Sequence, residues 1–356
     1  MGRLRVPLVK PIPDCREFLR AVTTDYEPRR PRLVEYIFND PLMKAVLGLL
    51  GREWVTPGAD RASRQAWCDR FIAFWYHMGY DFVRLEMSLA FPGVTGRFSV
   101  ETGRNFAETT RGPVASWQDF EKYPWPDPGQ ADFMPYEYIS THLPEGMGFI
   151  ANHAGGMYEH LSGLMGYETL CIALHEEPGL VGAIVQELGS RMMTYYERIL
   201  ELPNLIAIFP GDDMGFRTGT LISPDDLRKY TLPWHKKFAT LAHASARKFF
   251  FHSCGNIEKI MPDLIDDVRI DAKHSFEDAI LPVAEFKKRY GSRIGVLGGV
   301  DVDKLTRLRP CELRTYVRRI IDDCAPGGHF AIGSGNSIPD YVPLENYLTF
   351  VDEVLR

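Results

Sequence analysis

The sequence predicts an α/β protein of the (β/α)₈ barrel type. Eight short runs rich in β-branched or aromatic residues alternate with longer amphipathic stretches, and eight strand and helix units are the number that closes this barrel. A chain of 356 residues is also within the usual length of one such barrel, so we expect a single domain over residues 1–356. The predicted strands cover residues 31–38, 80–87, 146–152, 205–213, 248–255, 269–275, 293–301 and 329–336.

Two of the intervening stretches carry clear helix signals. Residues 222–246 open with Ser223 as N-cap and Pro224 in the first turn, followed by acidic residues that suit the helix dipole. Residues 179–202 carry an apolar stripe on one side of a helix. The members of this stripe are Val181, Ile184, Val185, Leu188 and Met192.

Two segments fall outside the alternation of strands and helices. About residues 1–30 form a helical N-terminal extension, and about residues 92–130 are too long for an ordinary connection. We interpret the second segment, which is rich in Gly, Pro and Trp, as a lid-like excursion over the barrel mouth. Inside it, residues 98–110 alternate in polarity around a glycine-containing turn, which predicts a small hairpin.

The composition excludes several classes of protein. With 41 basic and 47 acidic residues the formal net charge is −6, which gives no sign of nucleic-acid binding. No run approaches the roughly 18 consecutive apolar residues of a membrane span, and the first residues lack the apolar core of a signal peptide. Six scattered cysteines without a framework spacing fit free thiols in a reducing compartment. We therefore expect a soluble cytoplasmic protein.

Polar side chains collect at the carboxyl ends of the predicted strands. In a barrel these ends face one shared basin, so such a collection predicts an active site. About a third of these residues would instead cap helices, as Asp212 would. The polar residues at strand ends are Glu35, Glu86, Asn152, His153, Asp212, Asp213, His252, Cys254, His274, Asp301, Ser334 and Asn336.

The pentapeptide HSCGN at residues 252–256 closes the fifth predicted strand and carries two soft metal ligands. Residues i and i+2 of a strand point to the same face, so His252 and Cys254 converge. An imidazole and a thiolate at a strand end suit a zinc ion, provided that further ligands come from elsewhere. The alternative is a buried histidine and cysteine that only pack there.

Several longer segments resemble the uroporphyrinogen decarboxylase superfamily, namely residues 155–181, 211–238, 249–278, 293–301 and 338–354. The resemblance implies a distorted (β/α)₈ barrel. The motif HxCG beginning at His252 resembles the branch that transfers methyl groups rather than the branch that decarboxylates porphyrinogens. The resemblance to that branch implies zinc at the site and a methylated corrinoid protein as methyl donor or acceptor.

The same resemblance implies a ligand set with one gap. His252 and Cys254 match the first two zinc positions of thiol methyltransferases, whereas the third position, a Cys after the last strand, is Ser334 here. Because serine is a poor zinc ligand, His274, Asp213 or Glu159 would complete the site. For His274 an equal alternative is a neutral imidazole that hydrogen-bonds the substrate.

The porphyrinogen-decarboxylating branch requires an early arginine motif that clamps the carboxylates of the substrate. After Arg32 this chain has no arginine until Arg52, and Lys44 alone makes no bidentate contacts. The sequence therefore argues against a porphyrinogen substrate.

We expect a methyltransferase that demethylates a small methoxylated or methylated compound with help from zinc and passes the methyl group to a corrinoid protein, which supplies the cobalamin. The runner-up is a decarboxylase of a small carboxylate or porphyrinogen-like substrate, and a third option is a binding barrel that has lost its chemistry. A homodimer is an open option. The expected catalytic residues are Asp213, His274, Glu86 and Glu159, the expected substrate-binding residues are Glu35, Tyr36, His153, Phe216 and Asn336, and the expected metal ligands are His252, Cys254 and His274.

Overall fold

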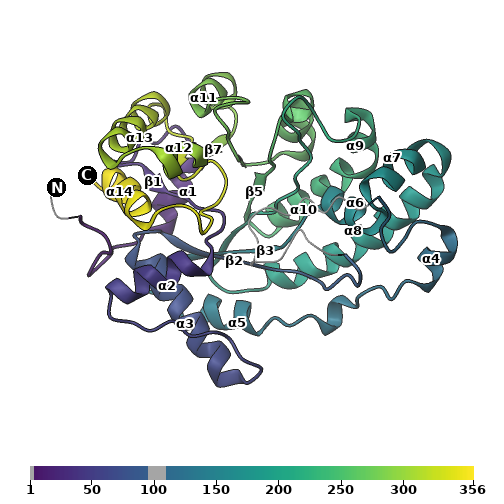
Figure 1. Ribbon diagram of the computed structural model, residues 1–356, viewed down its shortest axis with the longest axis horizontal. Coiled ribbons are helices and arrows are strands. Elements are labelled where there is room, and N and C mark those ends of the chain that lie inside the picture. Colours follow the sequence, from purple (N-terminus) through teal and green to yellow (C-terminus); the bar gives the residue numbers. More distant parts are fainter. Residues whose placement is uncertain (1–3, 95–109) are drawn as a thin grey trace.

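The computed structural model describes residues 4–94 and 110–356, in which eight parallel strands form one curled sheet surrounded by helices (Figure 1). The order of neighbouring strands is β1, β8, β7, β6, β5, β4, β3, β2, so each strand from β2 onward pairs with the next one along the chain. This arrangement confirms the predicted α/β barrel. The strands are β1 (Arg32–Leu33), β2 (Phe82–Met87), β3 (Gly148–His153), β4 (Leu205–Ile208), β5 (Lys248–His252), β6 (Ala272–His274), β7 (Gly295–Leu297) and β8 (Phe330–Ile332).

Helices connect the strands and cover the outside of the sheet (Figure 1). The α-helices are α1 (Cys15–Thr23), α2 (Asp40–Leu49), α3 (Arg61–His77), α4 (Trp117–Lys122), α5 (Met134–Thr141), α6 (Met157–Met165), α7 (Tyr167–Glu176), α8 (Pro178–Leu200), α9 (Pro224–Tyr230), α10 (Leu232–Ala244), α11 (Val283–Tyr290), α12 (Val302–Arg307), α13 (Pro310–Cys324) and α14 (Leu344–Val354). Shorter turns are η1 (Pro128–Gln130), η2 (Glu258–Ile260) and the π-helical η3 (Asp263–Val268).

Strand β5 shows how the barrel separates its two faces. Phe251 points outward and packs against His235 of α10, with ring centroids 4.8 Å apart. The next residue, His252, points inward and stacks on Tyr36 with a centroid distance of 4.1 Å. Because successive side chains of a strand face opposite sides, the inward side chains at the carboxyl ends meet inside the barrel.

The barrel is distorted at one place. Within the described residues, β1 pairs with β8 and β2 pairs with β3, but β1 and β2 share no backbone pair. Side chains bridge this opening, which we call the β1–β2 seam. Arg84 of β2 donates to the carbonyl oxygen of Tyr36 at 2.6 Å, and Arg32 of β1 donates to Asp81 at 3.2 Å.

The helix expected over residues 222–246 is divided into α9 and α10. Ser223 caps α9 as predicted, because its hydroxyl accepts a hydrogen bond from the backbone N–H of Asp226 at 3.0 Å. The last backbone hydrogen bond of α9 runs from the N–H of Thr231 to the carbonyl of Leu227 at 3.0 Å, and Pro233, two residues later, has no N–H with which to continue the helix. In α8, the predicted apolar stripe is buried throughout.

The described parts of the N-terminal segment and of the excursion add helices outside the strand and helix alternation. Helix α1 places Phe18 against Phe82 and Phe250, with centroid distances of 4.7 and 6.3 Å, so it covers part of the barrel interior. The hairpin predicted for residues 98–110 falls almost entirely outside the described residues. The described remainder of the excursion contains α4 and η1.

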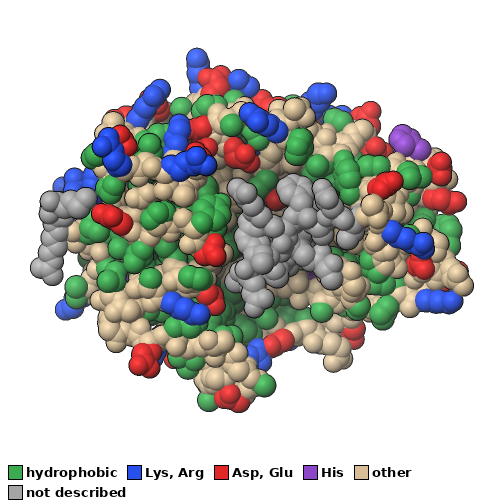
Figure 2. All heavy atoms as spheres, viewed as in Figure 1, with side chains coloured by type: hydrophobic (Ala, Val, Ile, Leu, Met, Phe, Trp, Pro, Cys, Tyr) green, Lys and Arg blue, Asp and Glu red, His purple; other side chains and the backbone are tan. Residues whose placement is uncertain are grey.

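The outer surface carries charges of both signs. On the face shown in Figure 2, basic and acidic side chains are mixed over the surface, and the formal net charge of the chain is −6. The described helices include none that combines the length and the apolar character needed to cross a membrane. The first described residues contact the last helix, since the backbone N–H of Arg5 donates to Asp352 of α14 at 2.8 Å.

Candidate metal centre

Three side chains with metal-binding atoms converge beyond the carboxyl ends of β4 and β5. They are Asp213, His252 and Cys254, and their ligand atoms all lie within 4.8 Å of one another. His252 Nε2 lies 3.3 Å from Cys254 Sγ and 3.4 Å from Asp213 Oδ1. One nitrogen, one sulfur and one oxygen form a donor set that zinc accepts. Three protein ligands also leave the fourth tetrahedral position for a substrate, as in catalytic zinc sites.

The tautomer of His252 is fixed by a relay of hydrogen bonds that ends on the backbone. His274 Nε2 lies 3.2 Å from the carbonyl oxygen of Ser334, which only accepts, so His274 carries its proton on Nε2. Burial, helped by the charge of His252, lowers the pKa of His274 well below its usual value, so His274 is neutral and its Nδ1 accepts. His252 therefore donates from Nδ1 across 2.7 Å, which leaves Nε2 as the nitrogen that faces Cys254 and Asp213 and that would bind a metal.

His274 lies behind His252 in this relay and is not among the three side chains whose ligand atoms converge. Both of its ring nitrogens are engaged, and the side chain has no exposed surface. Its place is one layer behind the ligands, where it orients His252. The same burial keeps it away from a proton of a substrate.

Asp213 and its neighbour Asp212 have opposite surroundings. The side chain of Asp213 is 40% exposed, and its Oδ1 accepts from the backbone N–H of Cys254 at 2.9 Å. Burial opposes its ionisation, but hydrogen bonding and the charge of His252 outweigh burial and lower the pKa of Asp213. The carboxylate is thus ionised and turned toward the other ligands.

Asp212 is a structural residue. It is fully buried and accepts from the backbone N–H groups of Tyr158 and Glu159, both at 3.0 Å, and it lies 2.7 Å from His235 Nε2. These contacts cap the N-terminus of α6, so Asp212 does cap a helix, although not the one that follows it in the sequence.

Cys254 is surrounded by groups that hold its sulfur in place. Asn336 Nδ2 donates to Sγ at 3.1 Å, and the Ser275 hydroxyl lies 3.7 Å from the same atom. Burial and the nearby charge of Asp213 raise the pKa of Cys254, so the free thiol is neutral and metal binding would displace its proton. Asn336, expected to bind substrate, thus contacts a ligand atom directly.

Ser334 does not occupy the third ligand position. Its hydroxyl donates to Glu35 Oε1 at 2.6 Å, and its backbone N–H donates to Glu35 Oε2 at 3.1 Å. Glu35 has no exposed surface, and burial raises its pKa to about 7 although these hydrogen bonds lower it. Both oxygens of Glu35 thus join the segment after β1 to the loop after β8, and its expected role in substrate binding stays a prediction.

Tyr36 forms the wall beside His252. Its ring lies between that imidazole and the Arg84 guanidinium, whose carbon is 3.6 Å from the ring centroid. Arg84 also bonds Glu86 at 2.5 Å. Burial and the charges of Glu86 and Glu159 raise the pKa of Tyr36 well above its usual value, so the phenol stays protonated.

Two predicted catalytic acids, Glu86 and Glu159, both raise the pKa of Tyr36 through their negative charge. Glu86 ends β2 and keeps 19% of its side chain exposed. Glu159 lies in the first turn of α6, where it accepts from the backbone N–H of Gly156 at 3.1 Å. Glu86, Glu159 and Asp213 all raise the pKa of Tyr36 through their negative charge.

Two residues predicted to bind substrate, Phe216 and His153, have opposite exposure to solvent. Phe216, in the loop before α9, is 54% exposed, and its carbonyl accepts from the backbone N–H of Asn256. His153 is fully buried, with one ring nitrogen 3.0 Å from the N–H of Leu89 and the other 3.3 Å from the carbonyl of Gly155. Burial lowers its pKa to about 3. His153 therefore joins the loops after β2 and β3, and its expected role in substrate binding stays a prediction.

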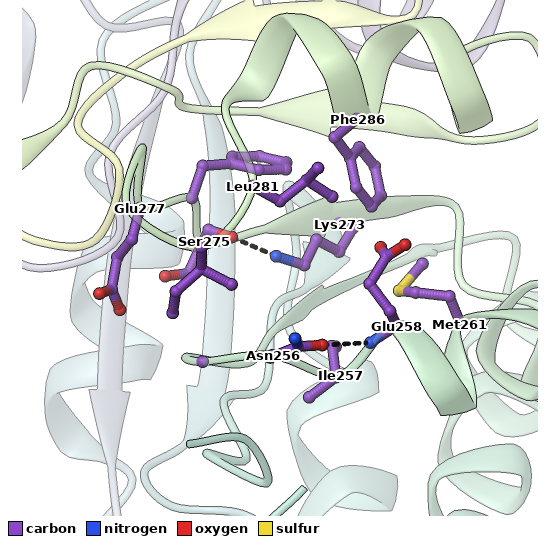
Figure 3. Close-up of a pocket in the computed structure, with 12 residues that line it drawn as sticks. Asn256, Ile257, Glu258, Met261, Lys273, Ser275, Glu277, Leu281 and Phe286 are labelled. Carbon is purple, nitrogen blue, oxygen red and sulfur yellow. Dashed lines mark hydrogen bonds between the residues drawn. The ribbon is translucent and has the colours of Figure 1, made fainter. Parts of the chain in front are cut away.

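Two basic residues beside the site, Arg84 and Lys273, are not among the residues predicted from the sequence. Arg84 is 2% exposed inside the barrel, and Lys273 is 4% exposed in a small pocket next to Ser275 (Figure 3). A charged residue in the middle of a short buried strand is rare, because burying a charge is costly. That pattern, in FVRLEM and in DAKHS, is the signal that would have identified both.

Comparisons with known proteins agree with this architecture. The model of the uroporphyrinogen decarboxylase (URO-D) family matches residues 65–356, and the chain belongs to this family. A methyltransferase from Methanosarcina mazei has a similar structure, with a TM-score of 0.73 at 17% identity over 95% of this chain and 96% of that one. A protein described as a vitamin-B12-independent methionine synthase from Listeria monocytogenes gives a TM-score of 0.46 at 9% identity over 93% of this chain and 97% of that one. No curated protein matches the sequence significantly.

Proposed function

We propose that the protein is a methyltransferase that demethylates a small methoxylated or methylated compound and passes the methyl group to a corrinoid protein. The observation that carries this proposal is the set of Asp213, His252 and Cys254 at the barrel mouth, with Nε2 of His252 turned toward the other two ligand atoms. These residues would hold zinc. The description of the Methanosarcina mazei neighbour as a methyltransferase supports the choice of reaction.

The chain's own groups would handle binding and protons around this centre. Tyr36 stays protonated and so is suited to donate a hydrogen bond to the oxygen that leaves when a methyl ether is cleaved. Glu86 and Glu159 are the candidate proton acceptors, because the negative charge of each raises the pKa of Tyr36. The chemistry that zinc supplies is Lewis-acid stabilisation of the negative charge that develops on that oxygen.

The cobalamin would come on a separate corrinoid protein that docks at the barrel mouth. All six cysteines are free thiols, which supports our placement of the protein in the cytoplasm. The homodimer stays a prediction.

The first test is metal analysis of protein purified without chelator. We expect zinc in the wild type and loss of most of it in Cys254→Ser, because a hydroxyl replaces a thiolate poorly. Cys171→Ser is the matched control, since Cys171 is also a partly exposed free thiol but lies in α7. Unchanged zinc in the Cys254 variant would contradict the proposed ligand set.

The second test addresses the reaction. The protein is incubated with a panel of methoxylated and methylated compounds and with reduced cobalamin or a corrinoid protein, and the formation of methylcobalamin is followed by absorbance. We expect methylcobalamin with at least one compound. Release of carbon dioxide from a carboxylated substrate, without methyl transfer across the panel, would move the assignment to a decarboxylase.

A further inference from the structure

The loop after β8 carries a side-chain amide to the sulfur of the candidate metal centre. Asn336 Nδ2 donates to Cys254 Sγ at 3.1 Å. The backbone N–H of Asn336 donates to Ser334 Oγ at 3.3 Å, and this hydroxyl in turn donates to Glu35 at 2.6 Å. Because Glu35 has no exposed surface, the main chain of the loop is tied to the barrel interior, and the amide extends from a fixed backbone.

The sulfur accepts this hydrogen bond, because its own proton is directed elsewhere. The side chains of Cys254 and Asp213 are hydrogen-bonded to each other. An ionised carboxylate only accepts, so the thiol donates to Asp213 and leaves its lone pairs for Asn336. A metal held by Cys254 and Asp213 would take the place of that thiol proton. The Asn336 amide contacts a lone pair and not the S–H bond, so it does not compete with a metal for that position.

A second polar group near the sulfur, the hydroxyl of Ser275, makes a weaker contact. It lies 3.7 Å from Cys254 Sγ, whereas the carbonyl oxygen of Gly335 lies 2.9 Å from the same hydroxyl. A hydroxyl has one proton to donate, and the closer carbonyl oxygen is also the stronger acceptor. Asn336, at 3.1 Å, is therefore the closer and better donor to the sulfur.

We propose that Asn336 is a positioning residue that holds Cys254 and limits the negative charge that its sulfur gives to a bound metal. An N–H group that donates to a thiolate takes up part of its charge, and such hydrogen bonds tune metal sites that contain cysteine. With less charge from the sulfur, the centre polarises an oxygen atom more strongly, which is the chemistry that zinc would supply here. This inference rests on the proposed metal centre, but its test does not use the methyl-transfer reaction.

The experiment uses cobalt(II) in place of zinc. The absorption band for charge transfer from a thiolate sulfur to cobalt reports the energy of the sulfur electrons, which zinc does not reveal. Protein freed of metal by a chelator is loaded with an equimolar amount of Co²⁺ without air, and its near-ultraviolet spectrum is recorded. Asn336→Leu keeps a similar volume but has no N–H group. We expect its band to move to longer wavelength than that of the wild type, because electrons are removed more easily from a sulfur without a hydrogen bond.

Asn256→Leu is the matched control. Asn256 lies two residues after Cys254, and its Oδ1 accepts from the backbone N–H of Glu258 at 3.2 Å (Figure 3). The same substitution is thus made in the loop of the ligand itself, at an amide that is turned to Glu258. We expect its band at the wild-type position. Asn336→Gln keeps an amide donor and should return the band toward that position. An equal shift in both leucine variants would overturn the proposal, because the band would then follow the packing of the loops.

The outcomes separate this inference from the proposed function. An unmoved band in Asn336→Leu, even with weaker metal binding, would mean that Asn336 only supports the loop, and the inference fails whether or not the wild type transfers methyl groups. A wild type without a sulfur-to-cobalt band would remove Cys254 from the ligand set and overturn the inference together with the metal centre. A shifted band in a protein that transfers no methyl group would support the role of Asn336 and contradict only the reaction.

Discussion

His252 owes its orientation to an atom of the backbone. The carbonyl oxygen of Ser334 determines which nitrogen of His274 carries a proton, and that proton determines which nitrogen of His252 is free. The candidate metal centre at the ends of β4 and β5 is therefore oriented by the loop after β8. The side chain at position 334 has no part in this control, because the contact uses the main chain.

The relay predicts that His274→Ala weakens zinc binding although His274 is no ligand. Loss of an outer hydrogen-bond partner of a metal-bound histidine costs about 10–100-fold in metal affinity. Affinity is measured by competition with a chromogenic chelator. His243→Ala serves as control, since His243 pairs with Asp271 on the surface and is expected to leave zinc affinity unchanged. Equal affinities in both variants would show that His252 needs no relay.

Glu35 gives the protein a stability that depends on pH. Burial raises its pKa to about 7 in the folded chain, against about 4.3 in the unfolded chain, so the folded state binds this proton more tightly. The stabilisation is fully present below about pH 4 and is lost as the pH rises through about 7.

Glu35→Gln should remove this dependence, since glutamine keeps the acceptor oxygen for Ser334 and carries no charge. We expect the free energy of unfolding of the variant, relative to the wild type, to rise by about 2–3 kcal/mol between pH 5 and pH 8. Urea titrations at several pH values measure it. A difference that is constant with pH would contradict the raised pKa.

The position of polar residues at the carboxyl ends of strands predicts where the candidate site lies, but it does not predict the role of each residue. Asp213, His252 and Cys254 were named because strand periodicity alone brings such side chains together. His274 and Glu35 look equivalent to them in the sequence. What removes them from the site is their hydrogen bonding to Ser334, a residue 60 positions away from His274, and such a contact cannot be derived from local spacing.

At the scale of elements, α8 and α10 are fitted to each other at one glycine. A Cβ at Gly189 would overlap the ring of Trp234, so the close approach of the two helices requires glycine there. The amphipathic pattern predicted α8 correctly, yet a glycine in a helix reads as a weakness when only the sequence is considered.

Gly189→Ala should therefore destabilise the protein by about 1–3 kcal/mol through overpacking. Gly182→Ala in the same helix is a matched control, because nothing lies within 4 Å of the added Cβ. That variant should stabilise by about 0.5–1 kcal/mol, since alanine is the better helix former. Thermal unfolding of the two variants measures these changes in stability. Destabilisation of equal size in both variants would refute the packing argument.

A proline explains why the helix predicted over residues 222–246 is divided into α9 and α10. The amphipathic pattern of residues 222–246 continues without interruption, so periodicity predicts one helix. Pro233 divides it, and α9 and α10 follow each other with a single residue between them. Pro233 is the signal in the sequence for this division, because a proline inside a helical stretch ends or kinks the helix.

At the scale of the whole molecule, closure of the barrel depends on Arg84. Its guanidinium is buried, spans the β1–β2 seam to the Tyr36 carbonyl and pairs with Glu86. Arg84→Met should cost about 3 kcal/mol or more, because it leaves a carboxylate without its partner and opens the seam. Arg319→Met, which removes an exposed pair with Asp323, should change stability by less than about 0.5 kcal/mol. Urea unfolding compares the two, and a loss of similar size in both would mean that the seam contributes nothing.

The seam also makes the molecule sensitive to the kind of ions around it. A ladder of backbone hydrogen bonds responds little to dissolved salts, whereas Arg32 and Arg84 join β1 to β2 with guanidinium groups. Guanidinium chloride brings the same cation in molar excess and competes for Asp81 and the Tyr36 carbonyl, while urea carries no charge. The two denaturants should therefore take the barrel apart in different orders, with the seam opening early only in the salt. The choice between them, usually one of convenience, becomes a probe of how this barrel is held shut.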